Sequence, residues 1–187
     1  GGRITMDKSV RVNSAVRFVG KGELVIESGV WLGYGMAGSS TLPILLQPRE
    51  PNAIIQIGQG TMIVNGTEIV ARSLIRIGAN CRIGGRSTII DADFHGLQPT
   101  ERDTPGLTAP VIIDDNVWLG NEVFILKGVH IGKDAVVGAR CVVAQNVPAG
   151  AIAVGNPMRI TGSVYAQSRQ EAVSTHQTSN QIGRAHV

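Results

Sequence analysis

The sequence predicts an all-β protein built as a triangular solenoid of short parallel strands. Two observations carry this prediction: aliphatic residues recur at strict six-residue steps, and glycine or asparagine recurs where such steps would turn a corner. A third observation agrees, because aromatic residues make up only 4% of the sequence while glycines number 24. A core of this composition is aliphatic and lies close to tight backbone turns.

The six-residue period is clearest in the second half of the chain. One aliphatic register consists of Ile113, Leu119, Ile125, Ile131, Val137 and Val143. A second register, four residues later in each unit, consists of Val117, Val123, Val129, Ala135, Cys141 and Val147. The first register also appears upstream, with a two-residue slip, as Ile57, Ile63, Ile69, Ile77, Ile83 and Ile89, after a weaker start at Ile26 and Leu32. A repeat this regular decides the fold class.

Neither a helix, with apolar residues every 3.6 positions, nor a simple strand, with a period of 2, explains a six-residue recurrence. Each unit is therefore interpreted as a short strand followed by a corner. Asn80, Asn116 and Gly128 stand near the corners and tolerate the positive φ angles of tight turns. Three sides would close one coil, and stacked coils would hold parallel strands about 4.8 Å apart. We expect such coils from about Val10 to Pro148.

Composition sets further limits on the kind of protein. At 187 residues and 43% hydrophobic, the chain can bury one main core. The net charge of +3 is too small for the dense basic face of a nucleic-acid binder. No apolar run approaches the ~18 residues of a membrane span, and the first residues lack the regions of a signal peptide, which favours a cytoplasmic protein. Cys81 and Cys141 fall on inward positions and are expected to be buried, reduced thiols.

The repeat breaks once in its central part, between Ile89 and Ile113. We expect a loop over residues 91–112, inserted into the solenoid. A loop this long on an otherwise economical fold is typical of a functional segment. It contains His95, and histidine is the residue type that most often accepts a proton from a hydroxyl in catalysis.

The repeat units resemble the hexapeptide-repeat acyltransferases, which form left-handed parallel β-helices. The resemblance covers roughly residues 10–160, and Ile77 to Ile160 is its specific part. Within it, the run Asp91, Ala92, Asp93, Phe94, His95 and Gly96, followed by Pro99, Glu101 and Arg102, resembles the catalytic loop of maltose, galactoside and polysaccharide O-acetyltransferases. The resemblance implies an acetyl-CoA-dependent transfer of an acetyl group to a sugar hydroxyl, with His95 as the general base.

The same resemblance suggests roles for other residues. Asp93 and Asp91 alternate with His95, so on an extended segment either could orient the imidazole or meet acceptor hydroxyls. Arg102 is a further candidate for binding the acceptor. Asn65 stands where related sugar acetyltransferases place an asparagine near the acceptor, although a corner asparagine is an equally good interpretation.

The downstream coils resemble the family's acetyl-CoA site. Small residues there would expose backbone to the pantetheine arm, and an outward tryptophan would be covered by the cofactor or by another subunit. Basic side chains would neutralise its phosphates. The cofactor-binding candidates are Trp118, Gly120, Lys127, Gly138, Ala139 and Arg159. The resemblance also implies a homotrimer with shared sites.

Two alternatives of other classes stay open. A γ-type zinc carbonic anhydrase on the same fold needs three histidines, but His176 and His186 lie in the tail, and His95 and His130 are not spaced as ligands on adjacent coils. No metal ligand set is therefore predicted, and His130 is expected to face outward into solvent. The other alternative is a non-catalytic structural solenoid.

The domain prediction is a β-helix over residues 1–162 and a polar tail over residues 163–187. The tail is rich in Ser, Gln and Thr without an apolar period, so a frayed helix or disorder is expected there. Its last residues, 182–187, resemble a translated sequencing adapter and are set aside.

Overall fold

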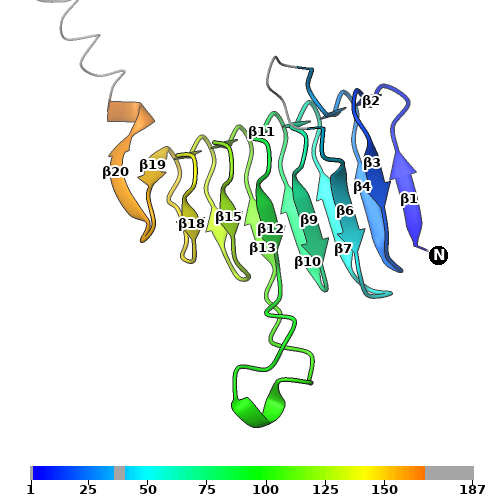
Figure 1. The fold of residues 1–187 in the computed structure, drawn as a ribbon. Helices are drawn as coiled ribbons and strands as arrows, with labels where there is room; N and C mark the ends of the chain where they lie inside the picture. The colour runs from blue at the N-terminus through cyan, green and yellow to red at the C-terminus, as the bar shows by residue number, and fades with distance from the viewer. Residues whose placement is uncertain (1, 36–40, 167–187) are drawn as a thin grey trace, which may run out of the picture.

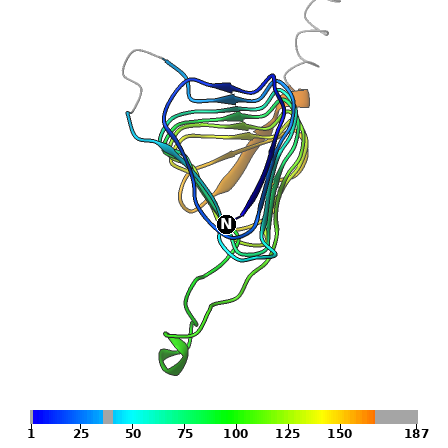
Figure 2. The ribbon, with the colours of Figure 1, turned by 90° about the vertical axis from the view of Figure 1, so that its right-hand side faces the viewer.

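The computed structural model describes residues 2–35 and 41–166 of the chain. Its strands wind into a stack of triangular coils, and Figures 1 and 2 show the stack from the side and along its axis. The expected all-β solenoid is confirmed. The polar tail from residue 167 onward lies outside the described residues, and residues 164–166 form one helical turn.

Each side of the triangle is one sheet, in which neighbouring strands are parallel except β19 and β20. The first sheet contains β1 (Arg3–Met6), β4 (Glu23–Ile26), β7 (Ile54–Ile57), β10 (Leu74–Ile77), β13 (Val111–Ile113) and β16 (His130–Ile131). The second contains β2 (Arg11–Val12), β5 (Trp31–Leu32), β8 (Met62–Ile63), β11 (Arg82–Ile83), β14 (Trp118–Leu119), β17 (Val136–Val137), β19 (Ala151–Val154) and β20 (Arg159–Ser163). The third contains β3 (Val16–Phe18), β6 (Ile44–Pro48), β9 (Glu68–Ala71), β12 (Thr88–Ile90), β15 (Phe124–Ile125) and β18 (Val142–Val143).

The core is a set of aliphatic columns that run along the stack. In the first sheet one column passes through register-paired Ile26, Ile57, Ile77, Ile113 and Ile131. Every residue of the two predicted six-residue registers is at most 2% exposed, so both inward registers are confirmed. The coils also extend beyond the expected range of Val10 to Pro148, from β1 to β20.

Corners are closed by left-handed residues and by hydroxyl side chains. The predicted positive φ angles are confirmed at Asn80 (58°), Asn116 (56°) and Gly128 (76°). Where Thr61 takes an inward corner position, its hydroxyl donates to the Gly78 carbonyl oxygen at 2.8 Å in the next coil. The buried Thr61 hydroxyl is thus paired inside the stack.

We call the corner between the first and second sheets the first corner, the corner between the second and third sheets the second corner, and the corner leading into the next coil the third corner. A segment that the periodicity did not predict, residues 33–43, lengthens the second corner between β5 and β6. The central loop leaves the third corner between β12 and β13 and spans residues 91–110, because Val111 and Ile112 already belong to β13. The central loop therefore leaves the stack at a different corner from the one between β5 and β6 (Figure 2).

The central loop is a structured hairpin. Its stem pairs Ala92 with Thr108 in an antiparallel bridge, and the Asp93 N–H donates to the Leu107 carbonyl at 3.0 Å. A short 3₁₀ helix, Pro99–Glu101, forms the tip. The loop accordingly protrudes as one defined arm (Figure 1).

Asp91 fixes the point at which the loop leaves the coil. Its carboxylate is fully buried and accepts backbone N–H bonds from Arg72, Ser73 and Leu74 at 2.7–2.8 Å. The expectation that Asp91 contacts the acceptor is therefore corrected, because both of its oxygens are already bonded inside the stack. Asp91 is a structural anchor between two coils.

None of the helical segments in the described ranges has the length and apolar character that crossing a bilayer requires.

The left-handed corner at Asn80 yields a first prediction. Asn80→Ala should destabilise the fold by about 1–2 kcal/mol, because a Cβ without a polar group disfavours φ near +58°. Asn80→Gly, which accepts the same φ, should stay within about 0.5 kcal/mol of the parent. Urea unfolding followed by circular dichroism measures both, and equal stabilities of the Ala and Gly variants would contradict the proposed origin of the effect.

A second prediction concerns Asp91. Asp91→Ala should cost at least about 3 kcal/mol of stability, because three buried N–H groups lose their acceptor. Asp91→Asn keeps one acceptor oxygen and should cost less. Asp103→Ala, in the exposed part of the same loop, is the matched control and should change the unfolding midpoint little. An Asp91→Ala variant as stable as this control would show that Asp91 is not an anchor.

Candidate active site

His95 lies on the loop with its side chain exposed to solvent. Its Nδ1 atom is 2.8 Å from the backbone carbonyl oxygen of Arg102 across the loop. A carbonyl oxygen only accepts, so Nδ1 carries a proton, and in the neutral imidazole Nε2 is then the nitrogen with the lone pair. The loop backbone packs tightly here, since a Cβ on Gly106 would lie 2.4 Å from the His95 carbonyl oxygen. The imidazole is thus held with its basic nitrogen available.

Asp93 does not orient the imidazole. Its Oδ1 instead accepts from the Lys127 ammonium at 2.7 Å, and both side chains are partly buried. Lys127 comes from the third corner of the next coil, so the pair ties the loop stem to the solenoid. One expectation is thereby corrected: the Arg102 carbonyl, and not Asp93, contacts the His95 imidazole. Contacts of Asp93 with the acceptor and of Lys127 with a cofactor phosphate remain predictions.

The Arg102 side chain takes no position against the imidazole. Its Nη1 lies 3.5 Å from the Gly96 carbonyl oxygen, which places the guanidinium along the loop itself. The backbone carbonyl of Arg102 contacts His95, whereas its side chain does not. A contact of the guanidinium with the acceptor remains a prediction.

A pocket of about 370 Å³ lies beside the imidazole, between the loop and the third corner. Its lining residues are Arg49, Glu50, Arg72, Phe94, His95, Asp103, Thr104 and Pro105. Sequence interpretation missed Arg72, one coil before the loop, and Arg49, two coils before it. The signal that could have found them is register: Pro48 pairs with Ala71, so the residues that follow both strands stack at the corner from which the loop leaves.

Four cofactor-binding candidates do meet in one groove. A second, mostly apolar hollow of about 530 Å³ runs over the second sheet near the second corner, and its lining includes Trp118, Gly120, Gly138 and Ala139. The Trp118 side chain is 58% exposed, as expected for an outward position. Gly120 also serves the stack, because a Cβ there would lie 2.6 Å from the Ala139 nitrogen. The groove lining at Gly120, Gly138 and Ala139 thus consists of residues with little or no side chain.

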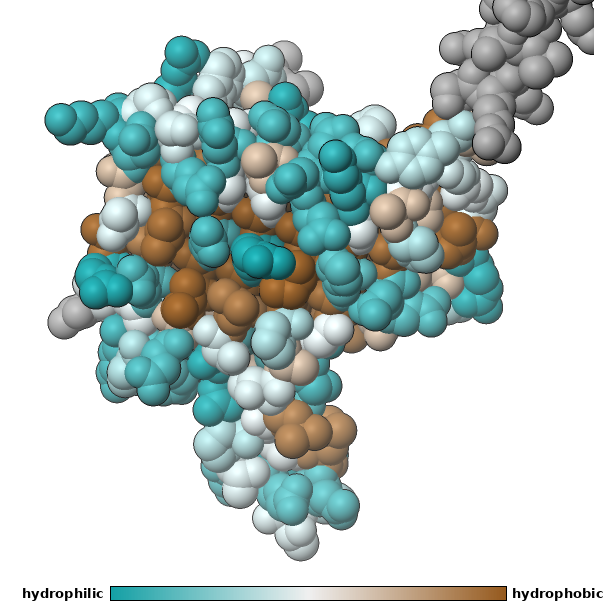
Figure 3. All heavy atoms as spheres, turned by 180° about the vertical axis from the view of Figure 1, so that it is seen from behind, coloured by the Kyte–Doolittle hydropathy of each residue, from teal (hydrophilic) through white to brown (hydrophobic). Residues whose placement is uncertain are grey.

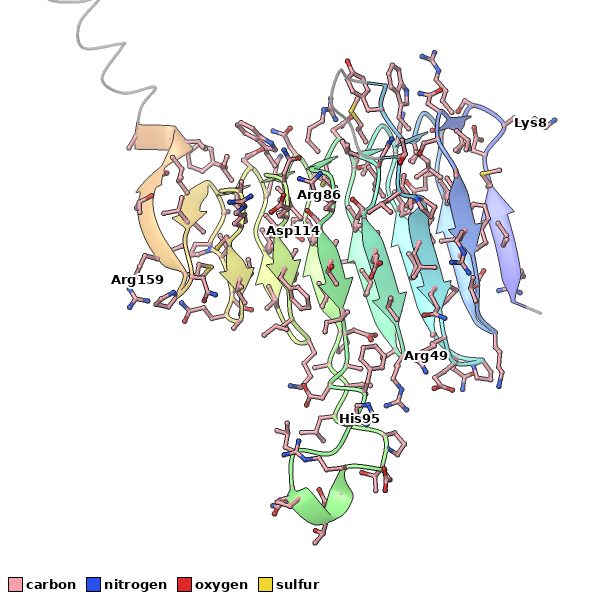
Figure 4. The ribbon with its side chains drawn as sticks, viewed as in Figure 1. Lys8, Arg49, Arg86, His95, Asp114 and Arg159 are labelled. Atoms are coloured by element: carbon pink, nitrogen blue, oxygen red, sulfur yellow. The ribbon has the colours of Figure 1, made fainter. Side chains whose placement is uncertain are left out.

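Two further candidates lie outside both hollows. Asn65 is 7% exposed at the second corner, where its Oδ1 accepts from the Tyr34 N–H at 2.9 Å. It lies at the second corner, away from His95, and its bond to Tyr34 fits a corner asparagine, while its contact with the acceptor remains a prediction. Arg159 is exposed on β20 at the far end of the stack, and Figure 4 shows it far from His95.

The candidate residues thus form two groups at different corners of the triangle. Asp93, His95, Arg102 and Lys127 belong to the third corner and its loop, whereas Asn65 and the groove belong to the second corner. Figure 2 shows that the loop projects away from the second corner. One coil stack does not bring the two groups together.

The other reactive side chains give no second centre. Cys81 and Cys141 are buried free thiols, as expected, and burial raises the pKa of each, which disfavours a nucleophilic thiolate. His130 faces outward, as predicted, and its Nε2 lies 2.8 Å from an Asp114 carboxylate oxygen. Within residues 2–35 and 41–166, no three His, Cys, Asp or Glu side chains are grouped to hold a metal ion. The zinc alternative has no candidate site in that part of the chain.

Comparisons with known proteins agree with the repeat and the fold. A family model described as bacterial transferase hexapeptide (six repeats) matches residues 110–147, and one described as the hexapeptide repeat of succinyl-transferase matches residues 74–92. A putative acetyltransferase of Saccharomyces cerevisiae is 36% identical over 101 residues, which cover 53% of this chain and 47% of that protein. The chain thus spans about half the length of this relative.

Two solved structures are similar to this chain over somewhat more than half of its length. A hexapeptide-repeat acetyltransferase from Vibrio cholerae, complexed with acetyl coenzyme A, is 35% identical with a TM-score of 0.57, over 59% of this chain and 60% of that one. A maltose O-acetyltransferase from Clostridium difficile 630 is 32% identical with a TM-score of 0.56, over 59% of each chain. The matched repeats and the shared architecture show that the chain carries hexapeptide repeats and has the left-handed parallel β-helix fold of these solved acetyltransferases.

Proposed function

We propose that the chain is an acetyl-CoA-dependent O-acetyltransferase that acts on a hydroxyl of a sugar or polysaccharide precursor, with His95 as general base. The observation that carries the proposal is the His95 imidazole, held through Nδ1 with Nε2 free beside a pocket. The acetyl-CoA complex and the maltose O-acetyltransferase among the similar structures support the donor and the acceptor class. Because acetyl-CoA is a cytoplasmic metabolite, the reaction is proposed to occur in the cytoplasm.

His95 would act in two proton transfers. Its Nε2 accepts the proton of the acceptor hydroxyl as that oxygen attacks the acetyl carbonyl, and the imidazolium then returns a proton to the leaving thiolate. Throughout, the Nδ1–H keeps its bond to the Arg102 carbonyl, which fixes the ring orientation. Acetyl-CoA supplies the activated thioester, so no side-chain nucleophile is required. This agrees with the buried thiols of Cys81 and Cys141.

The groove over the second sheet fits the donor. Its mostly apolar lining and the small residues Gly120 and Gly138 suit an extended pantetheine arm, which is apolar along much of its length. Trp118 offers a large ring at the groove for packing. Arg159 remains a candidate contact for a cofactor phosphate, and it lies on β20 at the end of the second sheet, outside the groove.

A complete site would need two copies of the chain, because the loop and the groove belong to different corners (Figure 2). We propose the homotrimer that the family resemblance implies, in which the loop of one copy meets the groove of the next. Figure 3 supports a second contact surface, since apolar side chains gather over the first sheet. Its outward positions include Val25, Ile54, Leu74 and Ile112. Gln56 and Arg76 lie among these residues in the same outward rows, so a contact surface here would be partly polar.

A non-catalytic solenoid is the remaining alternative. It explains the repeat but gives no reason for a structured loop that holds an imidazole beside a pocket. Acetyl-CoA titrated into the protein in a calorimeter separates the two, because a purely structural solenoid binds no donor.

The third prediction tests the base. His95→Ala should lower kcat by about 10²- to 10⁴-fold and leave the KM for acetyl-CoA within about twofold, because a base acts in the transition state. CoA release with a panel of sugars measures both. His130→Ala is the matched control: it removes the other histidine of the described residues, which is paired with Asp114 on the first sheet. An alanine variant at position 95 as active as this control would remove His95 from the mechanism.

The fourth prediction tests assembly. Trp118→Glu should shift the mass in solution from trimer to monomer and abolish turnover, because a charge would replace a covered apolar ring. Trp118→Phe keeps an apolar ring and should remain assembled and active. Light scattering and activity are measured on the same samples. A parent protein that is monomeric and active at assay concentration would show that one stack suffices.

A further inference from the structure

We infer that Arg49 binds a negatively charged group of the acceptor, so that the preferred sugar carries a carboxylate or a phosphate. This inference rests on the proposed function and specifies the acceptor class at the same site. It comes from the pocket beside His95, in which Arg49 is a guanidinium that has not yet been given a role.

The position of Arg49 is fixed by the stacking of coils. It directly follows β6 at the third corner, and its backbone N–H donates to the Ala71 carbonyl at 2.8 Å. Its guanidinium carbon lies 5.3 Å from the centre of the Phe94 ring. Figure 4 shows Arg49 pointing from the coil toward the base of the loop, where His95 lies. The guanidinium is thus pre-positioned over an aromatic face, which lowers the entropy lost when it binds an anion.

The Phe94 backbone is itself unusual. Its φ of 63° lies in the left-handed region, which a bulky residue rarely adopts. Such strained residues gather at functional sites, where the surroundings hold them in place. Phe94 directly precedes His95, and its ring lies beneath the Arg49 guanidinium.

The other charges of the pocket leave Arg49 available. The Arg72 side chain is 17% exposed, with its Nε 3.4 Å from the Glu50 carboxylate and its Nη1 3.3 Å from the Gly106 carbonyl. Within residues 2–35 and 41–166, no carboxylate forms an ion pair with Arg49. Asp103 adds one more carboxylate to the lining, so the formal charge of these groups sums to zero with His95 neutral. Selection for an anion must therefore come from the position of one guanidinium.

The pocket assigns this guanidinium to the acceptor rather than to the donor. It shares the pocket with the imidazole that takes the acceptor proton, whereas the groove with Trp118 lies at another corner. Arginine matches carboxylate and phosphate oxygens with two parallel hydrogen bonds, and such charge-assisted bonds discriminate strongly against a neutral partner. A donor phosphate contact is the competing assignment, and the experiment must separate the two.

The test compares glucuronate, glucose 6-phosphate and glucose as acceptors for the parent protein and for Arg49→Gln and Arg49→Lys. The parent should acetylate at least one anionic sugar with a KM at least about tenfold below that for glucose. Arg49→Gln should raise that KM about tenfold or more, with kcat, the glucose KM and the acetyl-CoA KM within about twofold. Arg49→Lys keeps the positive charge but cannot form two parallel hydrogen bonds, so its KM for the anionic sugar should lie between those of the parent and of Arg49→Gln. Comparing glucuronate with the phosphate shows which oxyanion is recognised.

Arg17→Gln is the matched control, because it removes an exposed arginine from β3, away from the pocket, and should leave every constant unchanged. Equal losses for glucose and the anionic sugars in Arg49→Gln, or a rise in the acetyl-CoA KM alone, would overturn the inference. Saturation-transfer NMR of the same three sugars measures binding without turnover. If the parent transfers no acetyl group yet binds an anionic sugar through Arg49, the proposed reaction fails while the anion site stands. Absence of any Arg49-dependent binding overturns the inference itself.

Discussion

The vertical stacking of identical coils is the constraint on which the rest of the structure depends. Parallel ladders place each residue above its counterpart in the coil below, so an aliphatic column forms only if all coils keep the same perimeter. Corners must therefore turn within very few residues, which explains the left-handed backbone at Asn80 and Asn116. Close stacking also excludes side chains at some positions, as at Gly120. Any additional chain must leave from a corner, because there it does not disturb the ladders.

The candidate site follows from that rule. The central loop and residues 33–43 both leave at corners, and the carboxylate of Asp91 binds three backbone N–H groups at the point where the loop departs. The Lys127 and Asp93 pair adds a second tie one coil further on. The loop therefore has a fixed base, and a histidine on an exposed arm can still have a defined position. Precision in this site comes from the solenoid rather than from the loop alone.

The architecture could be predicted from the sequence because the same signal is repeated many times. Residues such as Ile113 and Ile131 take the same inward position in successive coils. The asparagines at corners are explained by the positive φ angles that tight turns require. The roles of Asp91 and Asp93 could not be predicted in the same way. Alternation with His95 assumed an extended segment, but Phe94 is left-handed and Asp91 turns inward, so the three side chains do not share one side.

Contacts between coils were the other limit. Lys127 meets Asp93 although 34 positions separate them, and Arg49 meets Phe94 from an earlier coil. The six-residue period does contain this information, but the two-residue slip and the unpredicted segment 33–43 shift the frame. Which residues lie next to one another at the third corner could therefore be determined only from the strand pairing in the structure.

The way in which His95 is held has a consequence for how the loop can change during evolution. The partner of Nδ1 is a main-chain oxygen, and every residue that could replace Arg102 carries the same carbonyl. Drift at position 102 is therefore compatible with an unchanged imidazole orientation, provided the turn keeps its shape. Divergent members of such a lineage would be expected to preserve the path of the loop, with its close approach at Gly106, more faithfully than the side chains around the histidine. Side chains that select the acceptor could then change while the orientation of the His95 imidazole, which is fixed by a backbone carbonyl, stays the same.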